Sequence, residues 1–261
     1  MRQIFIFLSV VSFACVMVRG AVAEERGSEM ILIPAGEFIM GSRDDFGRKD
    51  EHPAHPVYLD AYYIDRYETT GKDFEAYMDD QPRVHPTITG WYERKVRPDM
   101  ARRPVFGLTW KRCQNYCVWA GKRLPTEAEW ERAARGTDDR IYPWGNEPPD
   151  PSRSNFGRCC FVMKGLVFND VGNLKAGKTP NNIFDLAGNV AEWVFDWYDK
   201  NYYKVSPRKN PKGPEKGRYH IIRGGAWNSF PGYLRSSARY GYNDAKDFYG
   251  IGCRCVKSAE E

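Results

Sequence analysis

Cysteine has the most reactive side chain in this sequence, and seven cysteines are present. Six of them follow the first 23 residues: Cys113, Cys117, Cys159, Cys160, Cys253 and Cys255. Thiolates bind soft metal ions such as copper(I), whereas the cysteines of exported chains mostly end in disulfides. Six cysteines allow about 15 pairings, so their number alone does not assign the bonds.

Cys159 and Cys160 are adjacent, and this pair has three competing interpretations. It could form a strained vicinal disulfide, act as a labile redox or metal-binding pair, or make two bonds to other cysteines. Inert disulfides are the commoner outcome in exported proteins. We therefore favour a structural role and keep the pair as the candidate reactive thiols.

The first 23 residues are typical of a secretory signal. Arg2 supplies the positive start, Ile4 to Val18 the apolar run, and Ala21-Val22-Ala23 a cleavage site. The apolar run is too short to span a bilayer. A lipoprotein anchor at Cys15 is a minor alternative, because the residues before it fit that motif poorly. We predict a signal peptide over residues 1–23 and a secreted or periplasmic domain over residues 24–261.

Charge and length limit the classes of partner. The formal net charge of +5 falls to +3 without Arg2 and Arg19, and the basic residues are spread among acidic ones. Nucleic acid is therefore excluded as a partner. The remaining chain has no second long apolar run, no Ser/Gly linker and no repeat, and its length fits one large domain or two small ones. We predict no membrane span and a monomer.

Three short helices are predicted from capping residues and apolar spacing. Thr70 precedes one helix and Thr109 another, which carries Cys113 and Cys117 on one face before Gly121. A capping box over Thr126 to Glu129 opens the third. Elsewhere short apolar runs alternate with Gly, Pro, Asn and Asp, so the sequence predicts an α+β fold with much irregular structure.

Charged residues inside the apolar pattern predict buried ion pairs. Asp65 to Glu68 forms one acidic group, and Arg223, Arg235 and Arg239 form a basic one. We expect these side chains to form charge networks around the core.

Six segments resemble, in order, the formylglycine-generating enzyme family, also called the sulfatase-modifying factor family. They are Met30 to Gly41, Pro56 to Thr70, Gly121 to Gly136, Tyr142 to Asn146, Asp185 to Trp193 and Arg223 to Gly225. The resemblance covers residues 28 to 257. It implies a single compact domain, a variant of the C-type-lectin-like fold with little regular secondary structure.

The resemblance also implies a chemistry that this chain does not reproduce. The family's founding activity oxidises a sulfatase cysteine to formylglycine with oxygen and a copper(I) ion held by two thiolates. Those thiolates fall at Ser229 and Leu234, while Ala226 and Gly250 replace a serine and an asparagine. Copper(I) prefers soft sulfur ligands, so we expect no copper cofactor.

The resemblance implies one disulfide, Cys117 to Cys255. Cys113 lies one helical turn from Cys117, and Cys253 lies two residues from Cys255 on a strand, so each pair shares a face. Cys253 also stands where the family has phenylalanine. We therefore predict a second bond, Cys113 to Cys253.

The segment from Asp185 to Glu192 resembles a calcium-binding segment of the family. The resemblance implies carboxylate ligands from Asp185 and Glu192 and backbone carbonyl ligands from Gly188 and Val190. Hard cations bind several oxygens, and a turn containing glycine can aim carbonyls inward. We expect a structural calcium ion there, against the alternative of a simple turn with a solvated Glu192.

The stretch from Arg223 to Arg239 is expected to form a ligand groove. Its candidate residues are Trp227, Ser229 and Arg239, and no base can be nominated for Ser229. Two functions therefore remain: an exported maturation or tailoring factor for a peptide or protein, without copper–thiolate chemistry, or a lectin-like module that binds a peptide or glycan. A third is formylglycine generation through Cys159 and Cys160. The resemblance includes relatives in siderophore maturation that lack copper.

Overall fold

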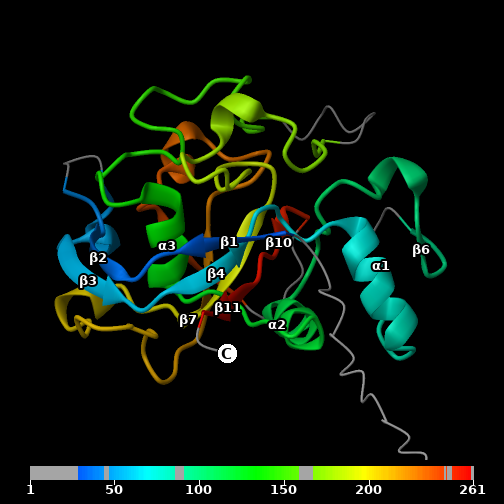
Figure 1. Ribbon diagram of the computed structural model, residues 1–261, viewed down its shortest axis with the longest axis horizontal. Coiled ribbons are helices and arrows are strands. Elements are labelled where there is room, and N and C mark those ends of the chain that lie inside the picture. Colours follow the sequence, from blue (N-terminus) through cyan, green and yellow to red (C-terminus); the bar gives the residue numbers. More distant parts are fainter. Residues whose placement is uncertain are drawn as a thin grey trace, which may run out of the picture.

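A computed structural model describes residues 29–43, 47–85, 91–158, 167–243, 245 and 249–259. The predicted signal peptide, with Cys15, and the pair Cys159–Cys160 lie outside the described residues. The described residues form one compact domain of mixed helices and small sheets with few helices, as predicted (Figure 1).

Two sheets form the centre of the domain. In the first, strands β1 (Met30–Ile33), β4 (Tyr62–Asp65) and β11 (Val256–Ser258) pair antiparallel. The second has the order β10-β7-β8-β9, made of β7 (Ala191–Trp197), β8 (His220–Arg223), β9 (Arg239–Tyr242) and β10 (Ile251–Gly252). Only the short β10 runs parallel to its neighbour.

Two hairpins complete the strands. They pair β2 (Gly36–Met40) with β3 (His55–Leu59), and β5 (Trp91–Tyr92) with β6 (Lys95–Val96). Short 3-10 turns lie between the strands and helices: η1 (Lys49–Glu51), η2 (Pro98–Met100), η4 (Lys175–Gly177), η5 (Tyr202–Lys204) and η6 (Pro231–Leu234).

The three predicted helices are present: α1 (Gly71–Asp80), α2 (Trp110–Trp119) and α3 (Glu127–Arg135). Thr70, Thr109 and Thr126 each cap a helix, because the side-chain hydroxyl accepts the backbone N–H of the third helical residue. In α3 the Glu129 carboxylate also accepts the Thr126 amide at 2.8 Å, which completes the predicted capping box.

Strand β7 separates two hydrophobic cores because successive side chains of a strand point to opposite faces. Trp193 packs into the core beneath α1 and α2, while Val194 packs into the core against α3. Ile222 and Ile221 of β8 divide between the same two cores. In Figure 1, α3 and the β2–β3 hairpin lie to the left, and α1 and α2 lie to the right.

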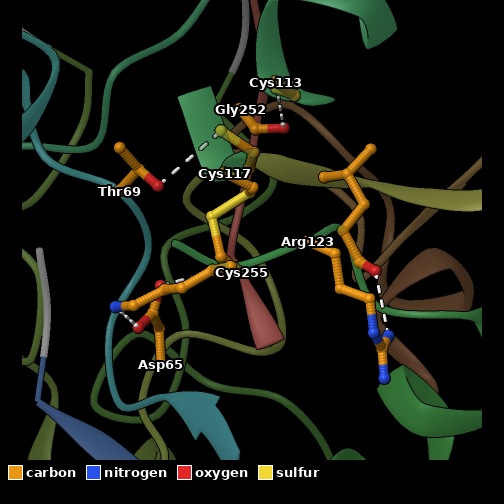
Figure 2. Close-up of a disulfide and its surroundings, with 10 residues drawn as sticks. Asp65, Thr69, Cys113, Cys117, Arg123, Gly252 and Cys255 are labelled. Carbon is orange, nitrogen blue, oxygen red and sulfur yellow. Dashed lines mark hydrogen bonds and ion pairs between the residues drawn. A yellow bond between two sulfur atoms is a disulfide. The ribbon is translucent and has the colours of Figure 1, made fainter. Parts of the chain in front are cut away.

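The Cys117–Cys255 disulfide is present and ties α2 to the segment between β10 and β11 (Figure 2). Cys113 and Cys253 are not joined in the structure: both are buried free thiols. Burial, followed by a hydrogen bond with Cys253, raises the pKa of the Cys113 thiol well above its usual range. The two side chains are therefore in contact, and the second bond stays a prediction for the oxidised protein.

Candidate functional site

The site is built around the turn that follows β8. Gly224 and Gly225 have φ angles of 84° and 69°, a backbone conformation that favours glycine. A side chain at Gly225 would crowd its neighbours, since an added Cβ would lie 3.1 Å from Leu234 Cδ2 and 3.3 Å from Ser229 Cβ. The turn therefore brings both Ser229 and Leu234 next to one glycine.

Ser229 and Leu234 are thus close in space, as the resemblance to a two-thiolate site requires. The Ser229 hydroxyl accepts the Ala226 amide at 2.9 Å, and its own amide donates to the Ala226 carbonyl at 2.8 Å. Leu234 is fully buried. Ser229 therefore stabilises the turn, and Leu234 fills the core.

A cavity of about 360 Å³ opens beside this turn. Its walls come from the β10-β7-β8-β9 sheet through Ala191, Ile222, Tyr242 and Ile251, and Ser229 contributes to its lining. These side chains are mostly apolar. The cavity suits an apolar or aromatic group of a ligand.

A second hollow of about 770 Å³ adjoins the cavity. The two share Phe230, Tyr233 and Tyr240 as a common wall, so we treat them together as the groove. The rings of Tyr233 and Tyr240 stack with centroids 4.6 Å apart. Phe230 is 74% exposed, and an exposed ring of this size at a cavity rim is typical of a binding surface.

Two of the three predicted groove residues do not line the groove. Trp227 is buried edge-on against Phe168, and its indole N–H has no hydrogen-bond partner among the described residues. Arg239 is fully buried, and its guanidinium binds both oxygens of Glu127, at 2.7 and 2.8 Å. Ser229 alone of the three lines the groove.

Sequence reasoning missed the aromatic wall and Arg48. Phe230, Tyr233 and Tyr240 have no spacing that separates them from the many core aromatics. Arg48 lies far away in the sequence, so its position beside Tyr240 depends on the tertiary fold.

The predicted charge networks are present beneath the groove. Arg223 donates to Glu127 at 2.8 Å and to Glu131 at 2.7 Å. Arg235 donates to both oxygens of Glu51 at 2.6 and 2.7 Å. These carboxylates and guanidinium groups are almost fully buried, so each charge depends on its partner.

The acidic group is distributed over two separate contacts. Lys122 donates to Asp65 at 2.7 Å. Glu68 accepts the Val190 amide and the Asn189 side chain. Both carboxylates are buried, and the Asp65–Lys122 ion pair confirms the prediction of buried charge pairing for Asp65.

The predicted calcium segment forms a tight turn before β7. Asp185 has a φ of 60° and accepts the Gly172 amide at 2.6 Å. Glu192 is buried and already engaged: Arg254 donates to both of its oxygens, and the Trp130 indole donates to one at 2.7 Å. A calcium ion at Glu192 would have to share this carboxylate with Arg254.

Acidic side chains outnumber guanidinium groups around Arg254. Burial, followed by repulsion from Asp185 and Glu192, raises the pKa of Glu68 well above its usual range. Three carboxylates thus lie close to the single guanidinium of Arg254. Within the described ranges, no group of three His, Cys, Asp or Glu side chains could hold a metal ion, although two carboxylates with two carbonyls would fall below that number.

The chain leading to Cys159 runs beside the groove turn. The Gly157 amide donates to the Ser229 carbonyl and the Arg158 amide to the Trp227 carbonyl, each at 3.0 Å.

In the part of the chain that the structure describes, no helix is long and apolar enough to cross a membrane.

Comparison with known proteins agrees with this geometry. The model of the sulfatase-modifying factor enzyme 1-like domain matches residues 18–259. The formylglycine-generating enzyme of Thermomonospora curvata is 32% identical, over 89% of this chain and 94% of the relative. The solved structure of PvdO from Pseudomonas aeruginosa is 27% identical with a TM-score of 0.74, and the match covers 88% of this chain and 94% of that one.

A further relative is longer than this chain. The serine/threonine-protein kinase pkn1 of Chlamydia caviae is 32% identical over 89% of this chain. The match spans only 38% of that relative's length.

Proposed function

The chain belongs to the sulfatase-modifying factor enzyme 1-like family, and we propose that it is an exported maturation or tailoring factor that binds a peptide or protein segment in the groove. The proposal is carried by the turn beside the groove, where Ser229 and the buried Leu234 pack against Gly225 at the positions of the two thiolates. We propose that the protein acts without copper–thiolate chemistry, because the hydroxyl of Ser229 and the isobutyl group of Leu234 do not replace soft sulfur ligands.

An anaerobic copper(I) titration, followed by oxygen and a Cys-x-Pro-x-Arg peptide, tests this proposal. We expect no tight copper binding and no loss of the peptide thiol. The matched control is the double variant Ser229→Cys/Leu234→Cys, which should gain copper(I) affinity because both of its sulfurs would lie next to Gly225. Tight copper binding by the unaltered chain together with thiol loss would contradict the proposal.

The same experiment separates the alternative that uses the adjacent cysteines. Thiol loss that disappears in Cys159→Ser/Cys160→Ser, and persists in Cys113→Ser, would assign formylglycine generation to that pair. Binding of a soft metal ion without loss of the peptide thiol would not assign that activity to the pair.

Binding without turnover is the second candidate function. The described residues that line the groove include no Cys, His, Lys, Asp or Glu, and the Ser229 hydroxyl already accepts a backbone amide. This lining supports recognition more directly than acid–base chemistry. Mass spectrometry of a partner captured from the periplasm distinguishes the two: an unchanged partner favours a binding module for a peptide or glycan, and a changed one favours a tailoring factor.

Calcium is proposed as a structural ion at the turn before β7. Asp185 and the carbonyls of Gly188 and Val190 would hold it, with Glu192 shared between the ion and Arg254. The excess of carboxylates over guanidinium groups supports this assignment.

Thermal unfolding in calcium and in a calcium chelator tests the ion. We expect a higher Tm with calcium, since a ligand at one hundred times its Kd stabilises the folded state by about 2.7 kcal/mol. The gain should vanish in Asp185→Asn and remain in Asp138→Asn, whose carboxylate is exposed. Equal Tm values in calcium and chelator would remove calcium from the proposal.

Export rests on the pattern of residues 1–23. Sequencing the mature amino terminus should find cleavage after Ala23. A mature chain that begins with an acylated Cys15 would instead indicate a lipoprotein.

A further inference from the structure

The groove carries an uneven charge that bears on what it binds. Two arginines, Arg48 and Arg235, line the larger hollow, and no described residue of either hollow is acidic. The two arginines differ in how fully their charge is balanced.

The charge of Arg235 is neutralised inside the protein. Its guanidinium is bound by both Glu51 oxygens, and Glu51 also accepts the Ser237 hydroxyl and the Arg48 amide. With four hydrogen bonds, the Glu51 carboxylate is fully occupied. It is therefore unavailable to a basic group of a ligand, and Arg235 is unavailable to an acidic one.

Arg48 differs because its side chain is 46% exposed. Its guanidinium lies over the Tyr240 ring, 4.3 Å from the centroid, and its only ion-pair contact among the described residues is at 3.4 Å, to Asp50. The other Asp50 oxygen accepts the Tyr198 hydroxyl at 2.8 Å. Arg48 thus presents a positioned, incompletely neutralised cation at the aromatic wall.

We propose that the groove selects polypeptide segments in which an apolar or aromatic side chain lies close to an acidic residue. The apolar group occupies the 360 Å³ cavity, and the carboxylate binds the Arg48 guanidinium in the adjoining hollow. A planar guanidinium can donate two parallel hydrogen bonds to a carboxylate. This inference rests on the proposed peptide-binding function and adds the charge of the segment.

A basic side chain of the ligand does not fit at the same place. A lysine or arginine of the ligand would face Arg48 and would find no described carboxylate on the groove surface. Like charges at short range repel, most strongly at low salt.

Binding of matched fluorescent peptides, measured by anisotropy, tests the inference. Each set keeps one aromatic residue and varies its neighbour among Glu, Gln and Lys. We expect the Glu peptide to bind roughly fivefold more tightly than the Lys peptide at low salt, as for a partly exposed ion pair. High salt should reduce the difference.

Arg48 variants assign the preference to this residue. Arg48→Gln should abolish the difference between the Glu and Lys peptides, and Arg48→Glu should reverse it. The matched control is Arg97→Gln, because Arg97 is similarly exposed but pairs with Asp99 away from the groove. Phe230→Ala should weaken all three peptides by the same factor, since it removes the shared wall.

The outcomes separate this inference from the function on which it rests. A Glu preference that survives in Arg48→Glu, or a Lys preference in the unaltered chain, overturns the inference alone. Equal binding of all three peptides does the same. Failure of every peptide to bind overturns both the inference and the proposed peptide-binding function.

Discussion

Glu127 binds two arginines that come from different strands. Arg223 at the end of β8 and Arg239 at the start of β9 both donate to its carboxylate, and none of the three side chains is more than 1% exposed. Burial alone would raise the pKa of Glu127, but Arg239 and Arg223 hold it below its usual range. Arg239 is thus held beneath the groove by its partner, which explains why it does not line the cavity.

Replacing Glu127 by glutamine should therefore be strongly destabilising. The change leaves two buried guanidinium groups with one carboxylate fewer, and breaking such a network costs about 3–5 kcal/mol. Urea unfolding of Glu127→Gln measures the loss. The control Glu37→Gln removes half of an exposed pair with Arg208 and should cost at most about 1 kcal/mol. Similar losses in the two variants would contradict the structural role of Glu127.

At single positions, the sequence indicated which residues lie near the groove turn better than it indicated where their side chains point. A glycine turn and a serine beside it are local features, and Ser229 does line the smaller hollow. Trp227 and Arg239 were expected there too, yet both point into the core. Which way a side chain points from a strand or turn depends on register with distant strands, which one sequence does not encode locally.

Among the larger elements, those set by local sequence were predicted and those set by distant contacts were not. The helices α1, α2 and α3 were predicted because their caps lie within three residues of each helix start. The groove could not be predicted in this way. Arg48 and η6 line the same hollow although they are far apart in the sequence. The resemblance to a family supplied the fold that local patterns could not.

The contact between α2 and the β10–β11 segment should accept a second covalent bond. Cys113 and Cys253 touch as thiols beside the existing Cys117–Cys255 disulfide. Oxidised glutathione should join them, each sulfur losing its hydrogen while one glutathione disulfide is reduced to two thiols. The reaction should be slow, because burial raises the pKa of the Cys113 thiol, which therefore forms little thiolate.

Peptide mapping by mass spectrometry without reduction measures this bond. A fragment linking the Cys113 and Cys253 peptides is expected after oxidation and absent before it. The variant Cys253→Ala is the matched control. A bond from Cys113 to Cys159 would contradict the pairing.

The stability of the whole molecule should depend on pH with two opposite slopes. Burial raises the pKa of Asp65 to about 6, even with the Lys122 ammonium 2.7 Å away. A carboxyl whose folded pKa is raised takes up its proton first in the folded state, so stability should rise slightly as pH falls from about 6 towards 4. Glu51 has the opposite shift: burial alone would raise its pKa, but Arg235 lowers it.

Glu127 has the same lowered pKa for the same reason. For both glutamates the unfolded chain binds protons first, so their contribution is complete above about pH 4.5 and is lost as pH falls through the lower folded pKa. Acid unfolding should therefore begin below about pH 4.5, after a shallow maximum near pH 5. Urea unfolding from pH 7 to pH 3.5 measures the curve.

The variant Glu51→Gln tests whether the buried pair of Glu51 with Arg235 causes the loss of stability at low pH. The variant has no carboxyl to protonate at this position, so it should be less stable at pH 7 yet lose less on acidification. The two stability curves should then converge at low pH. Parallel curves over the whole range would mean that other carboxyls control acid unfolding and that the charge network beneath the groove is not the part of the molecule that acid disrupts first.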